Sequence, residues 1–232
     1  MEPGDLFEEE ARWRGYRVVA GLDEAGRGPL AGPVVAAAVI LPRRCRMPGL
    51  NDSKVVPEAD RARLYGIILE RAVGVAVGVA SAEEIDAHNI LEATRLAMRR
   101  AVRGLVPQPD CLLIDALTLP SVDLSQRPIV KGDKISVSIA AASIIAKVHR
   151  DRVMTELHEI YPQYNFRGHK GYPTEEHRRL LRRHGPCPIH RHTFGPVQDC
   201  AAPLSRAAKK HPAQTDVLLD PMTLNGLGAD RW

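Results

Sequence analysis

The chain has 232 residues, of which 44% are hydrophobic and 26% are charged, and its formal net charge is +4. These values are ordinary for a soluble globular protein, and no apolar run approaches the roughly 20 residues that a membrane-spanning helix needs. The stretch 1–14 is acidic and polar and lacks the basic and apolar regions of a secretory signal. We therefore expect a cytoplasmic protein with no membrane association, built on one main domain.

The cysteines predict no zinc site and no disulfides, whereas the basic residues are concentrated in one segment of the chain. The four cysteines show no Cys-x-x-Cys spacing, which argues against a zinc site and against a disulfide framework. The segment 147–192 holds 10 Lys/Arg against 5 Asp/Glu, together with 7 of the 9 histidines. A solvated basic face explains this asymmetry by itself. Only in combination with an acidic cluster does it favour a polyanionic partner such as nucleic acid.

The first predicted strand ends in two adjacent acids. Residues 17–22 (RVVAGL) form a short apolar run that leads to Asp23 and Glu24, and a second apolar run follows at 34–41. The glycines between these runs loosely fit a dinucleotide-binding fingerprint, but that fingerprint requires a helix directly after the glycines. A second strand at this place speaks against dinucleotide binding, and we expect the two strands to pair antiparallel.

The middle of the chain alternates between helical and strand-like segments. Pro57 is suited to open a helix that runs to about residue 71, and 73–80 reads as a strand. Ser81 and Glu84 have the spacing of a capping box, which predicts one long helix reaching about residue 105.

Two further acids follow apolar segments. Asp115 interrupts the run 111–117, and Asp133 comes just after a predicted strand at 127–130. A lone ionised carboxylate in a buried strand is costly unless it is paired or binds a metal. Capping of a turn is a competing explanation for Asp115, as is a turn or a helix cap for Asp133.

The remaining chain is predicted to be helical and then irregular. The pattern predicts a helix over 136–161 whose alanines suit close packing on a sheet, and Ser143 and Lys147 share one of its faces. Thr174 is expected to cap a further helix that ends near residue 185. We expect one catalytic domain over 15–199 and a tail with at most local order over 200–232.

If the acid-bearing strands are neighbours in one sheet, four carboxylates converge on one patch. Divalent cations are needed to neutralise such a charge density, and oxygen ligands select Mg²⁺ or Mn²⁺ over zinc. Two such ions support in-line displacement at phosphorus. The neighbouring Gly26-Arg27-Gly28 combines a backbone that a ligand can approach closely with a guanidinium suited to phosphate. The pattern therefore predicts metal-assisted hydrolysis of a phosphodiester.

Five motifs together resemble the ribonuclease HII family, the type 2 ribonucleases H. They are DEAGRGPLAGP at 23–33, NDSK at 51–54, LLIDAL at 112–117, KGD with the helix up to Asp151, and HKGYPT at 169–174. The resemblance implies the ribonuclease H-like α/β fold, a central mixed β-sheet flanked by helices with additional C-terminal helices. It also implies two-metal endonucleolytic cleavage of the RNA strand of RNA/DNA hybrids, and cleavage 5′ of ribonucleotides embedded in duplex DNA, leaving 3′-hydroxyl and 5′-phosphate ends.

The resemblance assigns roles to individual positions of this chain. It implies that metal binding and catalysis fall on Asp23, Glu24, Asp115 and Asp133. The reader of the junction between ribonucleotide and deoxyribonucleotide falls on Gly26, Arg27 and Gly28, and the tyrosine that stacks beside the junction on Tyr172. Positions expected near the backbone phosphates are Lys54, Ser143 and Lys147, although Lys54 could equally be plain surface charge.

Three further points concern a non-catalytic alternative, a candidate second metal site and the oligomeric state. A non-catalytic nucleic-acid-binding protein would also need a basic face, but it has no reason to hold repelling carboxylates near a phosphate backbone. The histidine-rich segment 184–192 with Cys187 could mimic a soft-metal site, although its spacing is irregular. A monomer is the default oligomeric state.

Overall fold

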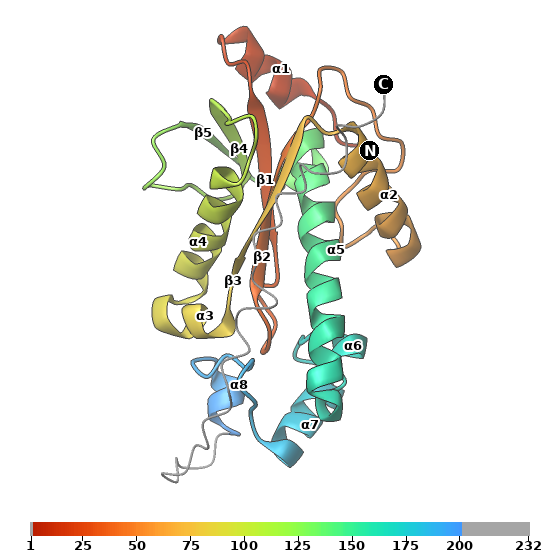
Figure 1. The fold of residues 1–232 in the computed structure, drawn as a ribbon, viewed down its shortest axis with the longest axis vertical. Helices are drawn as coiled ribbons and strands as arrows, with labels where there is room; N and C mark the ends of the chain where they lie inside the picture. The colour runs from red at the N-terminus through yellow and green to blue at the C-terminus, as the bar shows by residue number, and fades with distance from the viewer. Residues whose placement is uncertain (1, 201–232) are drawn as a thin grey trace.

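A five-stranded mixed sheet forms the centre of the computed structural model, which describes residues 2–200 (Figure 1). The strands are β1 (Val19–Ala25), β2 (Val34–Ile40), β3 (Gly74–Ala80), β4 (Cys111–Asp115) and β5 (Ser125–Ile129), in the spatial order β3-β2-β1-β4-β5. The pairs β1–β2 and β2–β3 are antiparallel, whereas β1–β4 and β4–β5 are parallel. The predicted mixed sheet is confirmed, and so is the antiparallel pair β1–β2, whose two strands are joined by residues 26–33, the glycine loop. The predicted tail lies outside the described residues from 201 onward.

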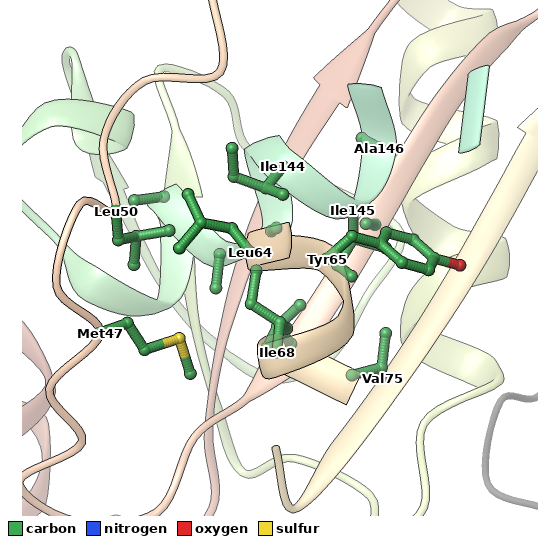
Figure 2. Packing of buried hydrophobic residues seen from close by; sticks show 14 of the residues in the cluster. Met47, Leu50, Leu64, Tyr65, Ile68, Val75, Ile144, Ile145 and Ala146 are labelled. Atoms are coloured by element: carbon green, nitrogen blue, oxygen red, sulfur yellow. The ribbon is translucent and has the colours of Figure 1, made fainter. Parts of the chain in front are cut away.

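Helices cover both faces of this sheet (Figure 1). On one face lie α2 (Glu58–Arg71) and the long α5 (Val137–Ile160), and on the other lie α3 (Ala82–His88) and α4 (Ile90–Arg103). All seven residues of β2 are buried, because alternate side chains face the two helical layers. Figure 2 shows the first layer, where Leu64 and Ile68 of α2 meet Ile144 of α5.

Helix α5 approaches the sheet closely because small residues line the contact. A Cβ added to Gly21 of β1 would lie 2.2 Å from the carbonyl carbon of Ser138, so only glycine fits there. Ala140, Ala141 and Ala142 are fully buried in the same helix, as the alanine-rich pattern predicted. The close contact holds β1 against the amino-terminal part of α5.

Helix α1 (Leu6–Trp13) was not predicted from the sequence. Its Glu8 is only 2% exposed and lies at the amino end of α5. The Glu8 carboxylate accepts hydrogen bonds from Ser136 Oγ at 2.6 Å and from the backbone N–H and the hydroxyl of Ser138 at 3.0 and 2.6 Å. A distant acid therefore caps the longest helix of the molecule.

The single helix predicted over 81–105 is wrong, because the structure divides it into α3 and α4 at Asn89. The capping box of Ser81 and Glu84 is present, but it belongs to the short α3. Asn89 has φ = +69°, and its side-chain oxygen accepts from the backbone N–H groups of Leu91 and Glu92. An asparagine that bonds to the next turn favours a new helix start over continuation of the old helix.

Short elements follow α5 and complete the fold. They are η2 (Pro162–Tyr164), α6 (Phe166–His169), α7 (Glu175–His184) and α8 (Gly195–Gln198), and they confirm the predicted additional C-terminal helices. Thr174 caps α7 as predicted, by accepting from the N–H of His177. The four cysteines are free thiols. Within residues 2–200, no helix has both the length and the apolar character needed to cross a membrane.

Candidate active site

The acids gather at one edge of the sheet because their strands are neighbours. Leu22 of β1 pairs in parallel with Ile114 of β4, so Asp23 and Asp115 occupy the next positions of the two strands. Asp115 in turn pairs with Ile129 of β5, and the 3₁₀ turn η1 (Gly132–Lys134), which carries Asp133, follows directly. The sequence predicted that the acids would converge if their three strands were neighbours, and β1, β4 and β5 are neighbours in the sheet.

Asp23 lies deepest in this patch and is 4% exposed. Its Oδ1 accepts a hydrogen bond from the backbone N–H of Glu24 at 2.7 Å. Burial, followed by the negative charges of Glu24 and Asp115, raises the pKa of Asp23 well above its usual range, and the Ser143 hydroxyl acts in the opposite direction. Burial and the neighbouring negative charges therefore outweigh the hydrogen bonds that stabilise the ionised form of this carboxylate.

Glu24 has one oxygen paired and one oxygen without a partner. Arg27 Nη1 lies 3.3 Å from Glu24 Oε1, whereas Oε2 is buried and accepts no hydrogen bond from the described residues. Burial raises the pKa of Glu24, and the charge of Asp115 adds to this effect, while Arg27 opposes it. A buried carboxylate oxygen without a donor is costly, and it is available to a cation.

Asp115 and Asp133 are linked through the turn that follows β5. Asp115 Oδ1 accepts from the backbone N–H of Gly132 at 2.8 Å, so it caps a turn, the competing explanation from sequence, and also belongs to the acidic patch. Asp133 is 5% exposed, and burial together with the charges of Asp52 and Asp115 raises its pKa. The two roles of Asp115 are compatible because its carboxylate has two oxygens.

Asp52 is a fifth acid of this patch and was missed in the sequence, although it stands in the same NDSK motif as Lys54. It is 5% exposed and accepts from the backbone N–H of Lys54. The ammonium of Lys54 lies 3.9 Å from Asp52 Oδ1 and 3.9 Å from Asp133 Oδ2. Burial opposes the charge of Lys54, but the surrounding carboxylates outweigh it and raise the pKa of Lys54. Lys54 is thus a cation among the acids and more than plain surface charge.

The donor set fits a hard divalent cation in its chemistry. All the candidate donor atoms are carboxylate oxygens, and Glu24 Oε2 is an unused acceptor among them. Within residues 2–200, no three Asp, Glu, His or Cys side chains are spaced so that they could hold an ion together, so the acids fit a cation by the chemistry of their oxygens and not by their spacing in this structure. The absence of such a group holds also for the histidine-rich segment 184–192, for which a soft-metal site was considered.

The glycine loop and Tyr172 lie side by side next to the acids. Gly26 has φ = +100°, and a Cβ there would lie 2.1 Å from Nε of Arg150. The N–H of Leu30 donates to the carbonyl of Gly171 at 2.8 Å, which ties the loop to the segment that carries Tyr172. Tyr172 is 38% exposed, so its ring is accessible at the surface.

The remaining predicted residues lie on α5. Lys147 Nζ is 5.7 Å from the centre of the Tyr172 ring and 2.7 Å from Asp151 Oδ1. Ser143 is 2% exposed and donates to Ser53 Oγ at 2.8 Å, so it lies beneath the acids. The structure brings all the predicted site residues to one region, in which Ser143 is buried.

Two buried histidines, His177 and His190, connect Cys187 to the backbone carbonyl of Tyr172 through hydrogen bonds. The N–H of Cys187 donates to His190 Nδ1 at 3.0 Å, His190 Nε2 lies 3.1 Å from His177 Nε2, and His177 Nδ1 lies 2.9 Å from the carbonyl of Tyr172. These contacts are all satisfied when His190 carries its proton on Nε2 and His177 carries its proton on Nδ1. Burial lowers the pKa of His177 to about 4 and that of His190 to about 3, which keeps both rings neutral.

The known proteins that resemble this chain in sequence or in fold are ribonucleases H. A family model described as Ribonuclease HII matches residues 20–197. The ribonuclease HII of Desulfitobacterium hafniense is 58% identical over 194 residues, which are 83% of this chain and 75% of that protein. The crystal structure of ribonuclease H2 from Pyrococcus horikoshii superposes with a TM-score of 0.65 at 27% identity, covering 79% of this chain and 97% of the other. Bst-RNase HIII in complex with Mn²⁺ has a TM-score of 0.59 at 22% identity, covering 82% and 71%, which is a likeness of fold.

Proposed function

The chain belongs to the ribonuclease HII family, and from this premise we propose that Asp23, Glu24, Asp115 and Asp133 are its catalytic and metal-binding residues. Members of this family are metal-dependent endoribonucleases that act on RNA/DNA hybrids, and this chain is therefore a ribonuclease H. The observation that carries the residue assignment is the convergence of three adjacent strands on one acidic patch in which Glu24 Oε2 has no partner.

We propose Mg²⁺ or Mn²⁺ as the metal, because the patch offers only hard oxygen donors. A fold neighbour bound to Mn²⁺ is consistent with this choice. When bound, such ions activate a water and stabilise the leaving oxygen at phosphorus. The protein's own part is to hold several carboxylates together in one buried patch, with the charge of Lys54 offsetting part of their mutual repulsion.

The neighbouring loop and Tyr172 suit recognition of the ribonucleotide. We propose that Gly26, Arg27 and Gly28 bind the junction at a ribonucleotide embedded in duplex DNA and that the Tyr172 ring stacks beside it, since the 2′-hydroxyl distinguishes RNA from DNA. We propose further that Lys54 and Lys147 bind backbone phosphates and that the buried Ser143 acts near them through Asp23, which its hydroxyl contacts. Cleavage 5′ of the ribonucleotide would leave 3′-hydroxyl and 5′-phosphate ends.

The test is cleavage of a DNA duplex with one ribonucleotide and of an RNA/DNA hybrid, each with no metal, with Mg²⁺ and with Mn²⁺. We expect metal-dependent cleavage that Asp23→Asn and Asp115→Asn abolish while circular dichroism stays that of the wild type. Asp110→Asn is the matched control, because Asp110 caps the backbone at the opposite end of β4. Full activity in either site variant would refute the assignment, and binding without cleavage by the wild type would favour the non-catalytic alternative.

A further inference from the structure

Two arginines are fully buried and face no carboxylate. Arg150 and Arg191 are both 0% exposed. No carboxylate oxygen within residues 2–200 lies within 4.0 Å of either guanidinium, although eleven other ion pairs form in this part of the chain. Burial of a charge without a counter-ion is costly, so the fold must gain something from these two groups.

All three guanidinium nitrogens of Arg191 donate hydrogen bonds to backbone carbonyls of the glycine loop. Its guanidinium makes six hydrogen bonds to five backbone carbonyls, those of Gly26, Arg27, Pro29, Gly32 and Pro33, at 2.5 to 3.3 Å. Arg150 lies beneath the same loop and binds the carbonyls of Ala31, Pro33 and Lys170. Of the two, only Arg191 binds the carbonyls of the Gly-Arg-Gly segment itself.

These bonds determine which way the loop amides point. In a trans peptide the C=O of one residue and the N–H of the next point in opposite directions. Because Arg191 draws the carbonyls of Gly26 and Arg27 inward, the N–H groups of Arg27 and Gly28 must face outward. Neither of these two amides donates to an acceptor within the described part of the chain. Two successive outward N–H groups form a small site for an electronegative atom.

We propose that Arg191 is a positioning residue for substrate: it orients the amides of Arg27 and Gly28 toward oxygen atoms of the ribonucleotide, and its buried positive charge strengthens them as donors. This role rests on the proposed function of the Gly-Arg-Gly loop. Burial, with the nearby charge of Arg150, lowers the pKa of Arg191 to about 9, so the guanidinium keeps its charge at neutral pH.

The variant that tests the proposal is Arg191→Lys, which keeps a positive charge but replaces the planar fork with an ammonium that cannot span five carbonyls. The measurement is the ratio of Kd values for an all-DNA duplex and for the same duplex with one ribonucleotide, without metal. We expect this ratio to fall about tenfold relative to wild type, since one well-made discriminating contact is worth about that factor. Arg100→Lys is the control, because Arg100 also binds a backbone carbonyl, that of Val79, but none of the carbonyls of the glycine loop.

The outcomes separate this proposal from the one it rests on. A wild type without preference for the ribonucleotide would overturn both, whereas a preference that survives in a folded Arg191→Lys protein would overturn only the role of Arg191. If Arg191→Lys does not fold, amide NMR of the wild type decides. The N–H signals of Arg27 and Gly28 should then shift on addition of the ribonucleotide duplex and not on addition of all-DNA duplex, and equal shifts would refute the proposal.

Discussion

Ionisation of the Asp23 carboxyl group destabilises the folded protein, because the group is buried beside other acids. Its pKa in the folded protein is raised above the ordinary value of 3.8, so the folded state binds this proton more tightly than the unfolded chain does. Its contribution to stability is therefore present at low pH and is lost as pH rises through the folded pKa. In metal-free buffer at pH 7.5, we expect Asp23→Asn to raise the melting temperature, by about 2–4 °C for each kcal/mol gained. A lower melting temperature than that of wild type would contradict this account.

The contributions of the Tyr172 ring and of its hydroxyl can be measured separately with two variants. The ring is partly exposed, with the cations of Lys147 and Arg150 each 5.7 Å from its centre. Stacking of a base on an aromatic ring is worth about 1–3 kcal/mol. We therefore expect Tyr172→Ala to reduce the cleavage preference for a ribonucleotide-containing duplex about tenfold or more, and Tyr172→Phe to keep most of it. Equal losses in the two variants would assign the effect to the hydroxyl instead.

At the scale of elements, the contact of α1 with α5 depends on Glu8. Removal of its carboxylate in Glu8→Ala would leave the hydroxyls of Ser136 and Ser138 without their buried acceptor. We expect a loss of about 2–3 kcal/mol in the free energy of unfolding, measured by urea denaturation. Glu9→Ala is the matched control on the same helix, because Glu9 forms only a partly exposed pair with Arg12. That variant should lose less than about 1 kcal/mol. Similar losses would show that Glu8 adds no more than an ordinary helix contact.

The elements that the sequence predicted well are those whose signal is local. Apolar runs identify β1 and β4, and each ends in an acid that is expensive to bury, so the acidic patch could be predicted once the strands were taken as neighbours. Asn89 has a local signal too, but the strong helical period around it concealed the break. Long-range contacts leave no such mark: Arg191 binds carbonyls more than 150 residues away, and Glu8 binds Ser138 at a separation of 130.

For the whole molecule, the pH dependence of stability reflects opposing groups. The buried acids of the site have raised pKa values and favour the folded state as pH falls. Buried histidines act in the opposite direction, because the unfolded chain takes up protons near pH 6.5 that the folded rings of His177 and His190 refuse. Their stabilising effect is complete above pH 6.5 and is lost as pH falls toward the folded values of about 4 and 3.

The histidine chain therefore makes a prediction that its own variant can test. At pH 5 each of the two rings should cost about 2 kcal/mol relative to neutral pH, since an unfolded histidine is mostly protonated there. His177→Asn keeps a donor for the carbonyl of Tyr172 but removes one titrating ring. We expect it to lose less free energy of unfolding than wild type between pH 7.5 and pH 5, by about half of the contribution of the histidine pair. His192→Asn, at an exposed position, should behave as wild type. A pH dependence in His177→Asn equal to that of wild type would mean that His177 takes up its proton as readily in the folded protein as in the unfolded chain, and it would contradict a buried, neutral hydrogen-bond chain from Cys187 to Tyr172.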